Sequence, residues 1–229
     1  MADDVPAVLF AATSANKLGS MDTGCWLEEM AAPYYILKKR GFEPTIASPA
    51  GGKIPLDPRS TQEGQLSATS KNFLKDNEAM DKLNNSVRTS EVDPDDFVAL
   101  FVPGGHGIMV DGPKDMKPLV ETFAKQGKLV SAVCHGPAAF TEAELDGQPI
   151  VKGKKVTSFS NSEEEKIGGT KAVPFLLEDR LKERGAHYHK GEDWSPFVVT
   201  DSKMITGQNP QVIPLTLLAI GTPMGAASP

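Results

Sequence analysis

The sequence has few of the residues that define several classes of protein. Only two of its 229 residues are cysteines, Cys25 and Cys134, which is too few for a disulfide framework, and no CxxC pair indicates a zinc site. No apolar run is long enough for a transmembrane helix. The net charge is -6, and no basic cluster is typical of nucleic-acid binding. These absences predict a reducing, cytoplasmic compartment with no membrane or nucleic-acid partner.

The composition is that of a globular protein. Hydrophobic residues make up 39% of the chain and charged residues 24%, so we expect one domain over residues 1–229 with a sizeable core. The N-terminal MADDVPAVLFAAT carries acidic residues before its apolar stretch, whereas a signal peptide carries basic ones. We therefore expect no export signal.

Apolar runs alternate with helical patterns along the chain, which predicts an α/β fold: a mostly parallel central sheet covered by helices on both faces. The expected strands are 5–12, 43–48, 97–102, 128–133 and 155–159, and a hairpin of 197–200 with 203–206. The expected helices are 24–40, 71–84, 116–126, 137–145, 173–184 and 210–220. The segment 49–69 is expected to be a loop, and 221–229 a disordered tail.

Two short loops follow neighbouring strands of this predicted sheet. PGGHG (103–107) comes directly after the strand 97–102, and Cys134-His-Gly-Pro comes directly after 128–133. Ligands of open α/β sheets bind at the carboxyl ends of the strands, so the two loops are expected to share one pocket. The glycines of the first loop allow backbone N–H groups to approach a ligand closely, as an oxyanion hole requires.

Cys134 stands between a strand and an expected helix, which is the geometry of a nucleophile elbow. The N–H groups that begin the helix would then lower the pKa of the thiol and favour the reactive thiolate. The alternative is an inert cysteine in the core. His106, in the first loop, is either a pocket residue or a solvent-facing loop residue.

Together, FVPGGHG and VSAVCHGPAA resemble the ThiJ/PfpI superfamily of flavodoxin-like proteins. Within it, the chain resembles the glutathione-independent glyoxalase III (D-lactate dehydratase) branch, which includes yeast-type heat-shock chaperones. Three further segments support this branch: DTGCWLEEMAAPYYILKKRGFE, GKKVTSFSNSEE and VVTDSKMITGQNP. By the same resemblance, residues 49–90 are an insertion near the active site that could cap the pocket.

The resemblance implies a role for each matching residue. Cys134 is expected to be the nucleophile and Glu29 a buried carboxyl that contacts its sulfur and shuttles a proton. His135 is expected to be the second member of a triad and Glu164 its acidic partner. The backbone N–H groups of Gly105 and His135 are expected to form the oxyanion hole.

Several of these assignments can be read in a second way. A shift of one residue would exchange Glu29 for Glu28, and the run SEEE offers three candidates for the acidic triad member. The run also fits a capping box with Ser162 as N-cap and Glu165 as its partner, in which Glu164 would only favour the helix dipole.

Aromatic and histidine residues elsewhere are open to two interpretations. We expect His106, Trp26 and Trp194 to bind substrate, although either tryptophan, like Cys25, could belong to the core. His187 and His189 are two residues apart and lack a third ligand, so we expect no metal there.

The resemblance implies conversion of a small 2-oxoaldehyde such as methylglyoxal to D-lactate, with no cofactor and no metal. The first alternative is a stress-response holdase, a redox sensor based on Cys134, or a protein deglycase. A cysteine peptidase or an amidotransferase is a weaker alternative, since no downstream His-x-Glu is present. A homodimer and unfolded-protein clients are the expected partners.

Overall fold

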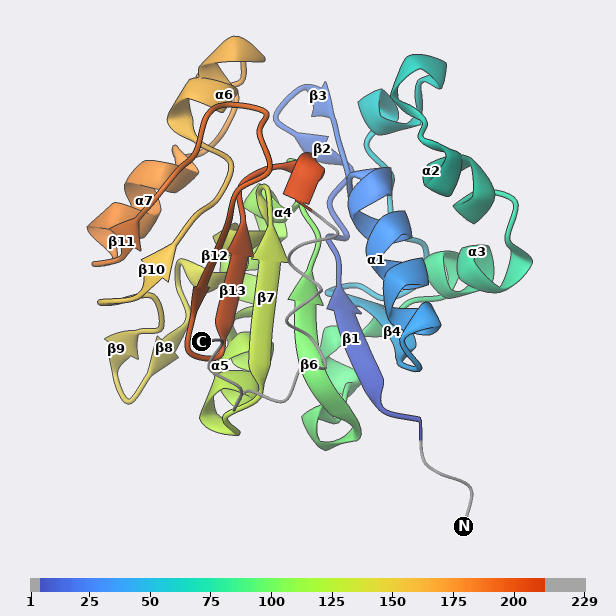
Figure 1. Ribbon diagram of the computed structural model, residues 1–229, viewed down its shortest axis with the longest axis horizontal. Helices are drawn as coiled ribbons and strands as arrows, with labels where there is room; N and C mark the ends of the chain where they lie inside the picture. The colour runs from blue at the N-terminus through green and yellow to red at the C-terminus, as the bar shows by residue number, and fades with distance from the viewer. Residues whose placement is uncertain (1–4, 213–229) are drawn as a thin grey trace, which may run out of the picture.

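The computed structural model describes residues 5–212, and its centre is a seven-stranded sheet (Figure 1). The strand order is β12-β13-β7-β6-β1-β4-β5, and every neighbouring pair is parallel except the antiparallel β12–β13 hairpin. The strands are β1 (Ala7–Ala11), β4 (Glu43–Ser48), β5 (Val87–Arg88), β6 (Phe97–Val102), β7 (Leu129–Val133), β12 (Val198–Asp201) and β13 (Met204–Gly207).

Successive side chains of β1 enter two different cores, because side chains of a strand point alternately to the two faces of its sheet. Val8 and Phe10 belong to the core under α1 (Leu27–Lys39), α2 (Ala68–Phe73) and α3 (Asn77–Asn84). Leu9 and Ala11 belong to the core under α4 (Ile108–Asp115), α5 (Lys117–Lys125) and α7 (Leu177–Glu183). The predicted three-layer α/β fold is therefore confirmed.

The remaining elements are short. Two antiparallel pairs are β2 (Lys17–Leu18) with β3 (Met21–Asp22), and β8 (Glu144–Leu145) with β9 (Gln148–Pro149). One parallel pair is β10 (Lys155–Val156) with β11 (His187–Tyr188), next to α6 (Asn161–Lys166). The 3-10 turns are Pro58–Thr61, Glu63–Gln65, Thr89–Glu91, Pro94–Asp96, Gly136–Phe140 and Pro210–Val212.

The single helix expected over 71–84 is wrong, because the chain forms α2 and α3 there. Ser67 begins α2 by accepting the N–H of Ser70. Asp76 is in extended conformation and its carboxylate accepts the N–H groups of Glu78 and Ala79, so a new helix starts at Asn77. A second N-cap inside the apolar pattern divides the segment.

The helix expected over 137–145 is also wrong. After Cys134 the chain makes only the 3-10 turn Gly136–Phe140, followed by β8. Conversely, α4 was not expected, because Gly112 and Pro113 within it are poor helix formers. The expectations over 5–12, 24–40, 155–159 and 173–184 were too long. Of the helix expected over 210–220, the described part 210–212 forms a 3-10 turn, and the rest lies outside the described residues, as does the tail expected over 221–229.

Between residues 5 and 212, no helix combines the length and apolar composition that crossing a membrane requires. A single domain over the whole chain and an insertion over 49–90 stay predictions.

We expect Asp76→Ala to lower the free energy of unfolding by about 1–2 kcal/mol, because Asp76 caps α3 and also accepts the hydroxyl of Tyr35. Urea unfolding measures this loss. Asp22→Ala is the matched control: Asp22 pairs with Lys17 on the surface, and such pairs contribute less than about 1 kcal/mol. Equal losses in the two variants would contradict the capping role.

Candidate active site

Cys134 occupies a strained backbone position at the carboxyl end of β7. Its φ is +60°, in the left-handed region that costs a residue with a side chain about 1–2 kcal/mol. Gly136 allows the turn to pass against β6, since a Cβ atom there would lie 2.3 Å from the carbonyl oxygen of Val102. The turn therefore lifts the Cys134 side chain out of the sheet, and the predicted nucleophile elbow is confirmed as a geometry.

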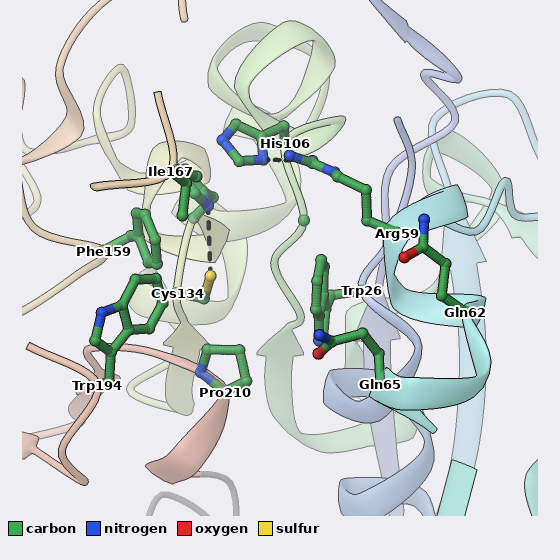
Figure 2. Close-up of a pocket in the computed structure, with 12 residues that line it drawn as sticks. Trp26, Arg59, Gln62, Gln65, His106, Cys134, Phe159, Ile167, Trp194 and Pro210 are labelled. Carbon is green, nitrogen blue, oxygen red and sulfur yellow. Dashed lines mark hydrogen bonds between the residues drawn. The ribbon is translucent and has the colours of Figure 1, made fainter. Parts of the chain in front are cut away.

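The thiol lies in a cavity of about 290 Å³ between the two predicted loops (Figure 2). Parallel pairing of β6 with β7 brings the loops together, as their position after neighbouring strands predicted. The residues that line the cavity come from both loops and from segments far from them in the sequence: Trp26, Arg59, Gln62, Gln65, Gly105, His106, Cys134, His135, Phe159, Ile167, Trp194 and Pro210. The three residues expected to bind substrate, His106, Trp26 and Trp194, are therefore all in the cavity wall.

Burial keeps Cys134 in the thiol form at rest. Only 5% of the residue is exposed, and its burial raises the pKa of the thiol well above the usual value, as does the nearby Glu29 carboxyl. The backbone N–H groups of His135 and Gly105 point at the sulfur and oppose this rise, but do not cancel it. The expectation of a lowered thiol pKa is wrong, because burial and the Glu29 carboxyl outweigh the N–H groups that face the sulfur.

Glu29 on α1 is the carboxyl next to that sulfur. It is fully buried, and its Oε2 accepts the N–H of Gly104 at 2.6 Å. Its Oε1 has no hydrogen-bond partner within the described residues, although Cys134 lies near enough to lower the carboxyl pKa. Burial outweighs both contacts and raises the pKa of Glu29 to about 8. Glu29 can therefore hold a proton at neutral pH.

Two histidines share the carboxylate of Glu164. His135 Nε2 lies 2.6 Å from Oε2, and His106 Nε2 lies 2.9 Å from Oε1. Although burial opposes it, these two hydrogen bonds lower the pKa of Glu164 to about 2. Burial, reinforced by the neighbouring His106, lowers the pKa of His135 to about 4. An ionised carboxylate thus faces a neutral His135 at neutral pH.

These contacts determine where the protons of His135 lie. A carboxylate only accepts hydrogen bonds, so Nε2 of His135 must donate to Glu164. Nδ1 of the neutral ring then carries a lone pair and lies 3.4 Å from Cys134 Sγ. His135 is therefore placed to accept the thiol proton.

Arg59 determines the proton position of the second histidine. Its Nη2 lies 3.0 Å from His106 Nδ1 and can only donate, so the ring proton of His106 is on Nε2, facing Glu164. The buried Asp57 holds the guanidinium by accepting from Nε at 2.9 Å and from Nη2 at 2.6 Å. Sequence reasoning missed Arg59, and the only signal near it was the turn beginning Asp57-Pro58.

His106, His135 and Glu164 form the cluster of described residues that could hold a metal ion, since their ligand atoms lie within 4.8 Å of one another. A metal needs a lone pair on each ligand atom. Here the facing nitrogen of each histidine carries a proton that is donated to Glu164. The cluster fits a hydrogen-bonded relay better than a metal site.

The structure separates Glu164 from its neighbours in SEEE. The expected capping box at Ser162 and Glu165 is wrong: Ser160 is the N-cap of α6 and Glu163 its partner. Glu165 is exposed to solvent, which leaves Glu164 as the carboxylate that reaches the histidines.

Glu28, Cys25 and His187 lie apart from the reacting groups. Glu28 accepts the hydroxyls of Ser67, the N-cap of α2, and of Ser70 within α2, and is separate from the thiol. Cys25 lies in the core and not in the wall of the cavity. His187 lies in the short strand β11, with no metal-ligand cluster around it among residues 5–212.

Comparison with known families gives one match over most of the chain. The model of the DJ-1/PfpI family matches residues 23–221. Among curated proteins, "Glyoxalase 3" of Candida albicans is 34% identical over 89% of this chain and 92% of its own length. "Glutathione-independent glyoxalase HSP31" of Saccharomyces cerevisiae is 31% identical over 89% of this chain and 91% of its own length.

Two solved structures are similar to this chain over most of its length. The Rapid Encystment Protein 24 KDa of Francisella tularensis superposes with a TM-score of 0.88 at 37% identity, over 94% of this chain and 97% of its own. Glyoxalase III of Candida albicans superposes with a TM-score of 0.86 at 31% identity, over 95% and 96% of the two chains.

We expect His106 and His135 both to carry their ring proton on Nε2 at pH 7, which two-bond nitrogen–proton couplings measure by NMR. In Glu164→Ala, His106 should keep its proton on Nε2 because Arg59 still donates to Nδ1. His135, which loses the acceptor of its Nε2 proton, should populate both tautomers. Arg180→Met, which removes a surface ion pair to Glu142, is the control and should leave both rings unaltered. An Nδ1 proton on His106 in the unmodified protein would refute the assignment.

We also expect Glu29 to make stability depend on pH. Its pKa is raised from 4.5 in the unfolded chain to about 8, so the folded state holds this proton more tightly. Its stabilising contribution is complete below pH about 4.5 and is lost as pH rises through about 8, at ~1.36 kcal/mol per pKa unit. Urea unfolding at several pH values should show this loss in the wild type relative to Glu29→Gln. Parallel pH curves for the two proteins would contradict it.

Proposed function

Because the chain belongs to the DJ-1/PfpI family, we propose that it is a glutathione-independent glyoxalase that converts methylglyoxal or a related 2-oxoaldehyde to a 2-hydroxy acid such as D-lactate. The observation that carries this proposal is the surroundings of the Cys134 thiol. The sulfur has a buried carboxyl, Glu29, as one neighbour and a neutral imidazole, His135, as another. Names of relatives at 31–34% identity point to the same activity.

The first step is addition of the thiol to the aldehyde. As Cys134 Sγ attacks the aldehyde carbon, its proton passes to His135 Nδ1, and Glu164 stabilises the resulting imidazolium. The aldehyde oxygen becomes an oxyanion, and we propose that the N–H groups of Gly105 and His135, which face the sulfur, bind it. Return of the proton from His135 to this oxygen gives a neutral hemithioacetal.

The second step moves a proton between two carbons. The ionised form of Glu29 removes the hydrogen from the former aldehyde carbon and returns it to the neighbouring carbon, while the hydroxyl proton passes to the former ketone oxygen. The raised pKa of Glu29 makes its carboxylate a stronger base than a solvent-exposed one. Its buried Oε1, which has no hydrogen-bond partner among residues 5–212, is the atom available for this transfer.

The third step releases the product. The proton transfer leaves a thioester of the hydroxy acid on Cys134, and water cleaves it to the acid and the free thiol. In the overall reaction, one 2-oxoaldehyde and one water give one 2-hydroxy acid, with no net oxidation. We propose that no cofactor takes part, since the chain supplies the thiol that glutathione would otherwise provide. The same chemistry supports classification as a lyase of the D-lactate dehydratase type.

Functions of a different kind receive less support from the site. A redox sensor needs an exposed thiolate, whereas Cys134 is buried and its pKa is raised. A holdase or deglycase role, a cysteine peptidase or amidotransferase reaction, pairing into a homodimer, unfolded-protein clients and a cytoplasmic location all stay predictions.

We expect the wild-type protein to form D-lactate from methylglyoxal without glutathione, and Cys134→Ala to form none above background. A D-lactate-specific enzymatic assay measures the product, and the same assay after chelator treatment tests independence from metal. Glu28→Gln is the matched control for Glu29→Gln: the first should keep the activity, and the second should lose about 10²-fold or more. No D-lactate from the reduced wild-type protein would overturn the proposal.

A further inference from the structure

The cavity above Cys134 has two chemically different sides. Arg59, Gln62 and Gln65 lie on one side, whereas Phe159 and Trp194 lie on the other (Figure 2). Trp26, which precedes the helix that carries Glu29, lies across from Trp194 (Figure 2). Phe159 and Trp194 themselves take no part in the proton transfers assigned above, although the ring of His135 packs on Phe159.

Trp194 has an unusual backbone for an aromatic residue. Its φ is +64°, in the left-handed region, yet 42% of the residue is exposed. Burial of the indole does not account for a conformation that costs free energy, and strained residues that persist cluster at ligand sites.

A buried carboxylate holds Trp194 in this conformation. Glu163 is fully buried, and its Oε1 accepts the backbone N–H of Trp194 at 3.0 Å. The same oxygen accepts from Asn209 Nδ2 at 2.9 Å, and Oε2 accepts from the N–H of Ser160 at 2.9 Å. The backbone of Trp194 is thus anchored, and its indole lies at the mouth of the cavity.

The indole continues an aromatic wall that starts at the catalytic histidine. The rings of His135 and Phe159 have centroids 4.5 Å apart, and those of Phe159 and Trp194 are 5.6 Å apart, packed edge to face. Ile167, 41% exposed, adds an aliphatic side chain to the rim. The wall presents apolar surface to anything bound to Cys134.

The cavity is larger than methylglyoxal requires. Its volume is about 290 Å³, close to the ~300 Å³ at which pockets begin to enclose drug-sized ligands. Methylglyoxal, whose substituent is a single methyl group, would leave most of the aromatic wall in contact with water. A larger apolar substituent would cover it.

We propose that the wall formed by Phe159, Ile167 and Trp194 is a subsite for the substituent of the substrate, and that the preferred substrates are 2-oxoaldehydes with an aromatic or branched apolar substituent. This inference rests on the proposed function. With the oxyanion at the N–H groups of Gly105 and His135, and the migrating proton at Glu29, we infer that the substituent points toward Phe159 and Trp194 and away from Arg59. The reaction and its balance are unchanged: phenylglyoxal and water give mandelate.

Steady-state kinetics with phenylglyoxal and methylglyoxal test the subsite. We expect the wild type to have the higher kcat/KM for phenylglyoxal. In Trp194→Ala, the ratio of kcat/KM for phenylglyoxal to that for methylglyoxal should fall about tenfold, whereas Trp194→Phe should keep most of the ratio. Val98→Ala, which truncates a similarly exposed side chain at the amino end of β6, is the control and should leave the ratio unchanged. An unchanged ratio in Trp194→Ala would overturn the subsite.

A binding experiment separates this inference from the proposed activity. Both tryptophans of the chain line the cavity, so product binding to Cys134→Ala can be followed by their fluorescence. Mandelate should bind at least about tenfold more tightly than lactate, and Ile167→Ala in the same background should reduce that preference. If neither aldehyde is turned over but this preference is seen, the activity is refuted and the subsite stands. Equal binding of the two acids would refute the subsite even in an active enzyme.

Discussion

The whole site depends on one backbone conformation, the left-handed turn at Cys134. Because φ is positive there, the side chain leaves the end of β7 and the next residue turns its N–H back toward the sulfur. Gly136 allows the turn to lie directly against β6, which brings the glycine loop of β6 to the same sulfur. Neighbouring parallel strands and one strained residue thus create a pocket that neither loop could form alone.

The balance between burial and hydrogen bonds sets the charges around this turn. The two carboxyls have opposite shifts: Glu29, with one N–H donor, has its pKa raised to about 8, and Glu164, with two histidine donors, has its pKa lowered to about 2. The first is thereby suited to hold and move a proton, and the second to stabilise positive charge on an imidazole. Arg59 lies in the wall of the pocket and connects to Glu164 through His106. It orients the ring of His106 without contacting Cys134.

Much of the fold and of the site was predictable from the sequence, wherever a local pattern of residues also determines their position in space. Strands 43–48 and 97–102, the elbow and the shared pocket follow from apolar runs and from the rule that ligands bind at strand ends. Glu29 and Glu164 required a family resemblance, since they come from different helices that only the fold brings together. The contact of Arg59 with His106 and the backbone strain at Trp194 could not be predicted, because both depend on partners distant in the sequence. The thiol pKa also could not be predicted, because burial is a property of the whole fold.

Helix α6 links two functions through adjacent residues. Glu163 turns inward to hold Trp194 and Asn209, and Glu164, one residue later, turns toward His106 and His135. The capping serine, Ser160, sets the start of the helix and therefore the direction of both carboxylates. Substitutions in α6 that change the substrate range are therefore constrained. A shift of this helix that moved Trp194 would also move Glu164, and with it the acid–base centre. Divergence within such proteins should accumulate in the rim side chains, where substitution leaves the position of α6 intact.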